Sequence, residues 1–228
     1  MRSSTALALV TIATFIPSGT LALAPRPRAA TQCSWGGNTF SLPDAPKASV
    51  VGSYNSVEIK ARMLGEQGAQ FSFFRSRVQV FSKSIADVYN PNGWVGVSSD
   101  SLNFALNTSN GGAAGGWSVA IVRVPPLGPA VDLTNSIKVI EADFSKRHYC
   151  KARGDNYEAI QWRSNTQLLV SASVYGTSDC GADMGHTEGY VLDVVSDRII
   201  LHLTKTQMLN LPYICTYNVW RPGDPNPR

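Results

Sequence analysis

The sequence predicts an all-β fold of antiparallel strands, arranged as a meander that is either propeller-like or a β-sandwich. Apolar and charged residues alternate from Val57 to Met63, which is the two-residue period of a half-buried strand. Elsewhere, short apolar runs are separated by turn residues such as Ser196-Asp197. Two stretches about seventy residues apart contain these runs in the same order, which is typical of a repeated structural unit.

The first 24 residues have the composition of a cleavable export signal. Arg2 supplies a positive start, and the uncharged run Thr5–Ile16 is too short to span a bilayer as a helix. The A-x-A pattern predicts cleavage after Ala24, and cleavage after Ala22 is the alternative because Pro25 would otherwise follow the cut. An uncleaved membrane anchor is the competing interpretation. We expect a secreted or periplasmic protein with no stable membrane insertion after cleavage.

The mature chain then divides into a leader and one domain. Residues 25–49 are rich in Pro, Ala and Ser and predict an extended leader, anchored only at Cys33, Trp35 and Phe40. Residues 50–228 are predicted to form a single β domain, because all-β domains of this size often fold as one unit.

The first strands of this domain are expected between residues 57 and 81. A strand at Val57–Met63 is followed by a turn at Leu64–Gly68 and a partner strand over Phe71–Phe81 with a bulge near Phe73. A helix over Val57–Gln67 is the alternative, because its charged residues are good helix formers.

The rest of the domain contains the two copies, near residues 86–136 and 158–206. Each is interpreted as strand, turn, strand, long loop, strand, turn, strand. Asn92-Gly93 and Ser164-Asn165 are predicted to be turns between strands, and Gly116-Trp117 and Gly189-Tyr190 to start new strands after the long loops.

This second copy resembles a known repeat. A polar turn, an apolar strand, then Gly189-Tyr190-Val191-Leu192-Asp193-Val194 and a turn into Ile199-Ile200 resemble blades of the WD40-like and TolB-like β-propellers. The resemblance covers Val88–Thr206 and implies a propeller-like meander, complete or incomplete. The chain departs from these families because no Trp-Asp dipeptide closes a blade and the spacing exceeds the usual forty-odd residues.

Four cysteines lie in the mature chain, and an even number in an exported protein predicts disulfide bonds. We expect Cys150 to pair with Cys180 and Cys33 to pair with Cys215, although four cysteines allow three connectivities. A zinc site is the alternative, but the chain has no Cys-x-x-Cys spacing.

Charge and motifs exclude several classes of function. Without the signal, nineteen basic and sixteen acidic residues remain, and this excess is too small and too scattered to predict nucleic-acid binding. The chain has no Gly-x-Ser-x-Gly elbow and no phosphate-binding Gly-x-Gly-x-x-Gly between a strand and a helix. The sequence therefore predicts no cofactor and favours a binding protein over an enzyme.

The histidines give one candidate site. His148 is expected on the surface near a disulfide, and His202 on a strand with its side chain toward solvent. The loop Ser178–His186 contains Asp179, Asp183 and His186, which are the ligands locally available for a metal. A glycine-rich loop held by a disulfide at Cys180 is the interpretation that the sequence favours over a metal site.

The sequence thus predicts an exported, non-enzymatic binding protein of the cell envelope or exterior. The two long loops, Asn107–Gly116 and Tyr175–Gly189, occupy the same place in the two copies and are expected on one face. The partner would be another exported protein, for example one that this chain inhibits or to which it confers immunity. The alternatives are an exported hydrolase with a dispersed site near the 178–189 loop and a structural envelope protein. The candidate binding residues are Asn107, Trp117, Tyr175, Asp179, Asp183, His186 and Tyr190.

Overall fold

The computed structural model describes residues 39–42, 47–65, 68–110, 116–148, 155–175 and 180–211, all within one compact unit, Thr31–Arg228. The predicted signal, its cleavage site and most of the 25–49 leader lie outside these residues, as do Cys33, Cys150, Cys215 and Asp179. Among the residues described, no helix is long and apolar enough to cross a membrane.

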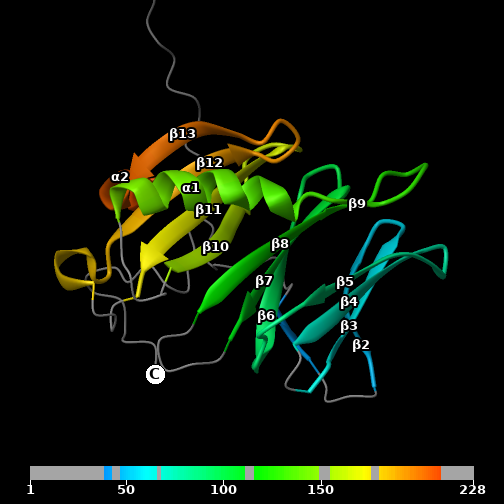
Figure 1. Cartoon of the computed structure of the whole chain (residues 1–228). Helices are drawn as coiled ribbons and strands as arrows, with labels where there is room; N and C mark the ends of the chain where they lie inside the picture. Colours follow the sequence, from blue (N-terminus) through cyan, green and yellow to red (C-terminus); the bar gives the residue numbers. More distant parts are fainter. Residues whose placement is uncertain are drawn as a thin grey trace, which may run out of the picture. The chain divides into compact units, whose positions relative to one another are not determined.

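The described residues form three antiparallel sheets, which confirms the predicted fold class (Figure 1). The N-terminal sheet has the order β2-β3-β4-β5, the central sheet β1-β6-β7-β8-β9 and the C-terminal sheet β10-β11-β12-β13, and in this part of the chain none closes into a barrel. The strands are β1 (Thr39–Ser41), β2 (Ser49–Tyr54), β3 (Val57–Met63), β4 (Ala69–Arg75), β5 (Val78–Ile85), β6 (Asn90–Val97), β7 (Asn103–Ser109), β8 (Trp117–Arg123), β9 (Val131–Asp132), β10 (Asp155–Trp162), β11 (Gln167–Val174), β12 (Thr187–Asp193) and β13 (Arg198–Thr204).

The N-terminal sheet follows the sequence pattern closely. Every second residue of β3, from Val57 to Met63, is buried, so the alternative helix over Val57–Gln67 was wrong. The predicted partner over Phe71–Phe81 is two strands rather than one, because Ser76 and Arg77 both have positive φ and turn the chain between β4 and β5. The pairing of these strands shifts between Phe73 and Phe74, where the bulge was expected.

The central sheet is buried on both faces. Phe104 and Leu106 belong to the core shared with the N-terminal sheet, whereas Ala105 and Ile121 belong to the core shared with the C-terminal sheet. Alternate residues of a strand point to opposite faces, so one sheet can serve two cores only if both sets are apolar.

The two predicted copies correspond to two four-stranded meanders, β6–β9 and β10–β13. Ser164-Asn165 lies in the turn between β10 and β11, as predicted. Asn92-Gly93, in contrast, lies inside β6, and the turn to β7 follows at Ser98–Leu102. A Cβ atom at Gly93 would overlap the Phe40 ring and the Asn107 carbonyl, so this glycine permits close packing and does not form a turn.

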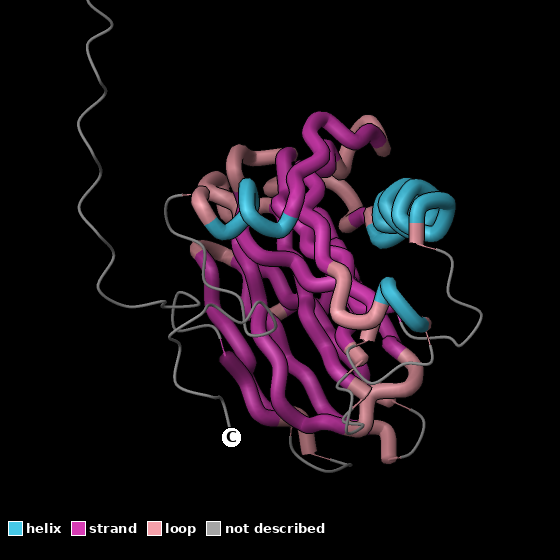
Figure 2. The backbone as a smooth tube through the Cα atoms, turned by 90° about the vertical axis from the view of Figure 1, so that its left-hand side faces the viewer, coloured by secondary structure: helices cyan, strands magenta, loops and turns pink. Residues whose placement is uncertain are grey.

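Neither α-helix of the described residues was predicted from the sequence. After the short 3-10 turn η1 (Thr134–Ser136), helix α1 (Ile137–Arg147) buries Ile137, Ile140 and Phe144 against the C-terminal sheet. Figure 2 shows α1 nearly end-on beside the strands. Three apolar residues at helical spacing suffice because the sheet supplies the rest of the core.

The C-terminal sheet has a second helix on its other face. Helix α2 (Lys205–Leu209) begins at Thr204, whose hydroxyl accepts from Gln207 N while the Gln207 side chain accepts from Thr204 N. Met208 is fully buried with Leu169, Val191 and Leu203 of this sheet. The sheet is therefore covered on both faces, by α1 and by α2.

Buried side-chain amides join the central and C-terminal sheets, and Asn107 is the most deeply buried of them. Asn107 on β7 donates from Nδ2 to Ala159 O at 3.1 Å and accepts from Ala159 N at 2.7 Å. The pairing of β10 with β11 shifts between Ala159 and Gln161, so the bulge brings this pair of backbone groups to the amide. Asn107 is fully buried, and its side chain satisfies two backbone groups that water cannot reach.

Replacing Asn107 by Ala should therefore destabilise the fold. Ala159 N would lose its partner and Ala159 O would keep only the longer contact from Trp94 Nε1 at 3.5 Å. An unsatisfied buried group costs about 1 to 3 kcal/mol, so we expect a loss of about 2 to 4 kcal/mol in the free energy of unfolding, measured with urea. The exposed substitution Gln79→Ala is the control and should change this free energy by less than about 0.5 kcal/mol. Equal stability of the two variants would contradict the role of Asn107.

Candidate functional site

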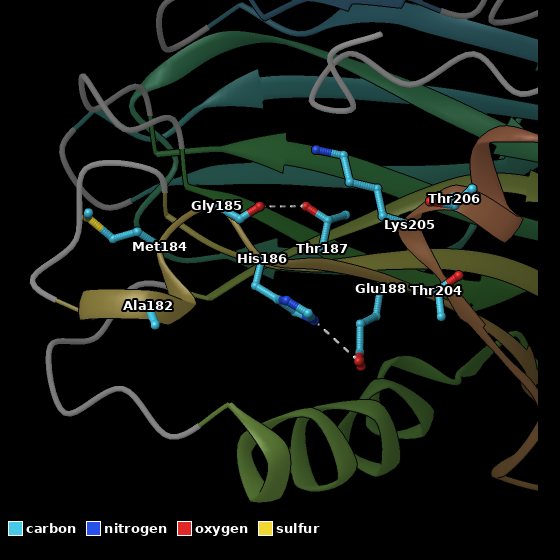
Figure 3. A pocket seen from close by; sticks show the side chains of 9 residues that line it. All are labelled: Ala182, Met184, Gly185, His186, Thr187, Glu188, Thr204, Lys205 and Thr206. Atoms are coloured by element: carbon cyan, nitrogen blue, oxygen red, sulfur yellow. Dashed lines mark hydrogen bonds and ion pairs between the residues drawn. The ribbon is translucent and has the colours of Figure 1, made fainter. Parts of the chain in front are cut away.

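The candidate site is built on strand β12 at the side of the sheet covered by α1. His186, Glu188 and Tyr190 are separated by one residue each, so they share one face of this strand. The backbone of His186 is held at both ends, because Val174 N donates to His186 O at 2.9 Å and His186 N donates to Asp183 O at 3.0 Å. Figure 3 shows the His186 ring directed at the Glu188 carboxylate.

Three further residues reach Glu188 from neighbouring elements. His202 lies on β13 directly opposite Tyr190 in the pairing of the two strands. Arg147 is the last residue of α1, and His148 caps that helix through its N–H, which donates to Phe144 O. Positive side chains are favourable at this end of a helix because its last carbonyls are unpaired.

The first oxygen of Glu188, Oε1, contacts two histidines and also Arg147, whose Nη1 donates to it at 3.3 Å. His148 Nε2 lies 3.1 Å and His186 Nε2 3.3 Å from Oε1. The two imidazole rings are stacked, with centroids 3.8 Å apart. The other nitrogen of His148, Nδ1, lies 3.3 Å from a carboxylate oxygen of Asp183, in the short turn η2 (Gly181–Asp183). Asp183 therefore fixes the ring of His148 with Nε2 toward Glu188.

The second oxygen of Glu188 is held by three other side chains. Tyr190 donates from its hydroxyl to Oε2 at 2.9 Å, Arg147 Nη2 lies at 3.0 Å and His202 Nε2 also at 3.0 Å. Arg147 is held in turn by Asp143, one helical turn earlier on α1. All three histidines of the chain thus contact one carboxylate, whose side chain is only 9% exposed.

These contacts decide the charge of the site. Burial by itself raises the pKa of Glu188, but hydrogen bonds from His148, Tyr190, His186 and His202 outweigh it and lower the pKa to about 2. Burial and the bond to ionised Glu188 raise the pKa of Tyr190 well above its ordinary value. At neutral pH the site therefore contains a charged carboxylate and a protonated phenol.

The arrangement has the ligand atoms of a metal site. His148 Nε2, His186 Nε2 and Glu188 Oε1 lie within 4.8 Å of one another. Zinc bonds of about 2.0 to 2.1 Å in a tetrahedron place neighbouring ligand atoms about 3.3 Å apart, which is close to the 3.1 and 3.3 Å found between each histidine and Glu188. Imidazole and carboxylate groups together suit zinc and related divalent transition metals.

The site opens into a cavity of about 360 Å³ that His186 and Glu188 line. Met184 lies at one end of this cavity, and Thr204, Lys205 and Thr206 line another part of it (Figure 3). The cluster is therefore accessible to a small molecule from one side.

Three of the residues that the sequence singled out belong to this cluster: Asp183, His186 and Tyr190. Asn107 is instead buried between two sheets, and Trp117 packs on Trp94 with ring centroids 4.3 Å apart. Tyr175 lies beside Gly116, where a Cβ atom would overlap its hydroxyl. Asp179 lies outside the described residues.

Sequence reasoning missed the centre of the site. His148 was predicted on the surface, but its side chain is only 12% exposed. His202 is exposed, as predicted, but its contact with Glu188 was not foreseen. The spacing His186-x-Glu188-x-Tyr190 was the signal that could have identified Glu188, since it aligns three polar side chains on one strand face. Arg147 and His148 had no such signal, because the helix that positions them was not predicted.

Only one of the four cysteines, Cys180, lies within the described residues. Cys180 precedes η2 and is not a free cysteine. The other three cysteines lie outside the described residues, so the pairing of Cys150 with Cys180 and of Cys33 with Cys215 stays a prediction.

Replacing Glu188 by Gln should flatten the loss of stability in acid. The pKa of Glu188 is lowered on folding from 4.5 to about 2, so its charged form stabilises the fold above pH 4.5 and this contribution is lost as pH falls through about 2. In that window the free energy of unfolding of the wild type should fall by up to about 1.4 kcal/mol per pH unit more steeply than that of E188Q, measured with urea and a chelator present.

The matched control is Glu58→Gln, which removes a partly exposed ion pair with Lys60. Such pairs contribute little to stability, so this variant should keep the wild-type slope. The same slope in wild type and E188Q would show that Glu188 is not held as described.

The chain shows no similarity to known proteins in three comparisons: no protein-family model, no curated protein and no solved structure matches it. The resemblance of Val88–Thr206 to WD40-like and TolB-like blades therefore stays a prediction from the sequence.

Proposed function

We propose that this protein binds a divalent transition metal, with zinc the best fit, through His148, His186 and Glu188. The observation that carries the proposal is the convergence of three ligand atoms, from the end of α1, the β11–β12 loop and β12, within 4.8 Å. These residues are up to forty positions apart in the sequence, so their meeting is a property of the fold.

The surroundings of the ligands support a metal rather than an ion pair alone. Metal-binding histidines usually donate their second ring nitrogen to a carboxylate, and Asp183 occupies that place for His148. Glu188 keeps Oε1 toward the two histidines because Tyr190 and His202 hold Oε2, and Arg147 contacts both carboxylate oxygens. Both ligand types are thus oriented by an outer layer of side chains, as metal sites generally require.

The proposed site differs from the ligand set considered from the sequence. Of Asp179, Asp183 and His186, only His186 would bind the metal, and Asp183 would orient His148. His202 is also outside the proposed ligands, because its Nε2 lies against the oxygen that faces away from the other histidines.

Titration with Zn²⁺ by calorimetry tests the proposal. The wild type should bind one equivalent, and His186→Ala and Glu188→Gln should each weaken binding by more than about 100-fold. Asp183→Asn should weaken it by about 10- to 100-fold, since it removes an outer partner and no ligand. Co²⁺ should give the absorption of a nitrogen- and oxygen-coordinated ion in the wild type.

Glu58→Gln is again the control, because Glu58 pairs with Lys60 in the N-terminal sheet and contacts no residue of the site. It should bind Zn²⁺ as the wild type does. Failure of the folded wild type to bind, or equal binding by H186A, would overturn the proposal.

A second candidate function is the protein-binding face expected from the sequence. One observation favours it: Tyr175, at the start of the second long loop, packs beside Gly116, at the end of the first, so these two loop ends lie together. If exported proteins are recognised there, a partner captured from culture supernatant by the wild type should be lost with Tyr175→Ala and kept with His186→Ala. If the partner is lost with H186A and kept with Y175A, it does not bind at this face.

A further inference from the structure

We infer that the metal site is catalytic, and that the protein hydrolyses esters or amides whose acyl part carries an anionic group some distance from the bond that is cut. This inference rests on the metal site proposed above. It names an activity and a substrate class, which metal binding by itself does not imply.

The number of ligands distinguishes a catalytic from a structural metal. Structural zinc has four protein ligands, whereas two histidines and one glutamate leave a coordination position for water. His186 is 39% exposed and lines the cavity together with Glu188, so the free position is reached from the cavity. A metal ion bound there would supply hydroxide near neutral pH from a coordinated water, whose other proton would pass to solvent.

The reaction is then an ordinary hydrolysis. The hydroxide oxygen bonds to the carbonyl carbon, and the carbon–oxygen or carbon–nitrogen bond to the leaving group breaks. The alcohol or amine leaves with the proton of the attacking hydroxide, and the acyl part leaves as a carboxylate. Water is the only co-reactant.

The cavity indicates the rest of the substrate. Its lining includes one positive side chain, Lys205, and the hydroxyl residues Thr204 and Thr206. Within the part of the chain that the structure describes, no carboxylate lies within ion-pair distance of Lys205. A cation that lines a cavity and has no carboxylate partner among the described residues suits a carboxylate or phosphate of a ligand.

The position of Lys205 sets the length of that ligand. Figure 3 shows His186 and Glu188 on one side of β12, and Lys205 on the other side with Thr187. The cavity therefore passes around the end of the sheet, where β12 begins and β13 ends. A bound molecule would need a spacer between the carbonyl at the metal and the anionic group at Lys205.

The test uses p-nitrophenyl monoesters of dicarboxylic acids with increasing numbers of methylene groups, each compared with the neutral ester of equal length. The zinc-loaded wild type should hydrolyse the longer anionic esters with a kcat/KM about tenfold or more above their neutral counterparts. Lys205→Met should lose this preference because its KM for the anionic esters rises, and it should keep the zinc affinity of the wild type. Lys138→Met, which removes an exposed lysine of α1, should keep the preference.

Failure of the activity, of the role of Lys205 and of zinc binding would each give a different result. If zinc binds with the affinities expected for the variants but no ester is hydrolysed faster than by free Zn²⁺, the activity is wrong and the metal site stands. If hydrolysis depends on zinc but K205M keeps the preference for anionic esters, the assignment of Lys205 is wrong. If zinc does not bind, the proposed function itself fails.

Discussion

A carboxylate that is almost completely removed from water must be paired, and pairing Glu188 brings three elements of the fold together. An unpaired buried charge costs several kcal/mol, so each donor around Glu188 is held at its place by this requirement. Strand β12 supplies Tyr190, with His186 directly before it; the end of α1 supplies Arg147 and His148, and β13 supplies His202. The network therefore links the helix to the sheet through polar contacts, at the point where the apolar contact of Phe144 ends.

The position of that helix depends on the central sheet. Because alternate residues of β7 and β8 are apolar on both faces, the sheet packs on the N-terminal sheet with one face and on α1 and the C-terminal sheet with the other. The buried amide of Asn107 joins the central sheet to β10 at its bulge. The N-terminal sheet thus lies far from the chemistry, and its role is to complete the core that supports the central sheet.

The contacts around Glu188 would have different roles without and with a bound metal. Without a metal, Glu188 is a carboxylate that accepts hydrogen bonds from every histidine of the chain. With a metal, Oε1 and two histidine nitrogens become ligands, while Asp183, Tyr190, Arg147 and His202 orient them. An ion bound there would replace the hydrogen bonds between Oε1 and the two histidines and would release their protons, so binding should weaken as the pH falls.

The sequence by itself determined the antiparallel β class, the strand at Val57–Met63, the bulge near Phe73 and the two meanders. These follow from short-range patterns, because a two-residue period and a turn residue act between neighbours in the chain. It also singled out Asp183, His186 and Tyr190, which lie in or beside one strand. Only the tertiary structure decided the site: α1 has a weak apolar pattern that needs the sheet to complete its core, and this helix positions Arg147 and His148. Glu188 and His202 meet through the register of β12 with β13, which no local pattern encodes, since pairing between strands is a long-range choice.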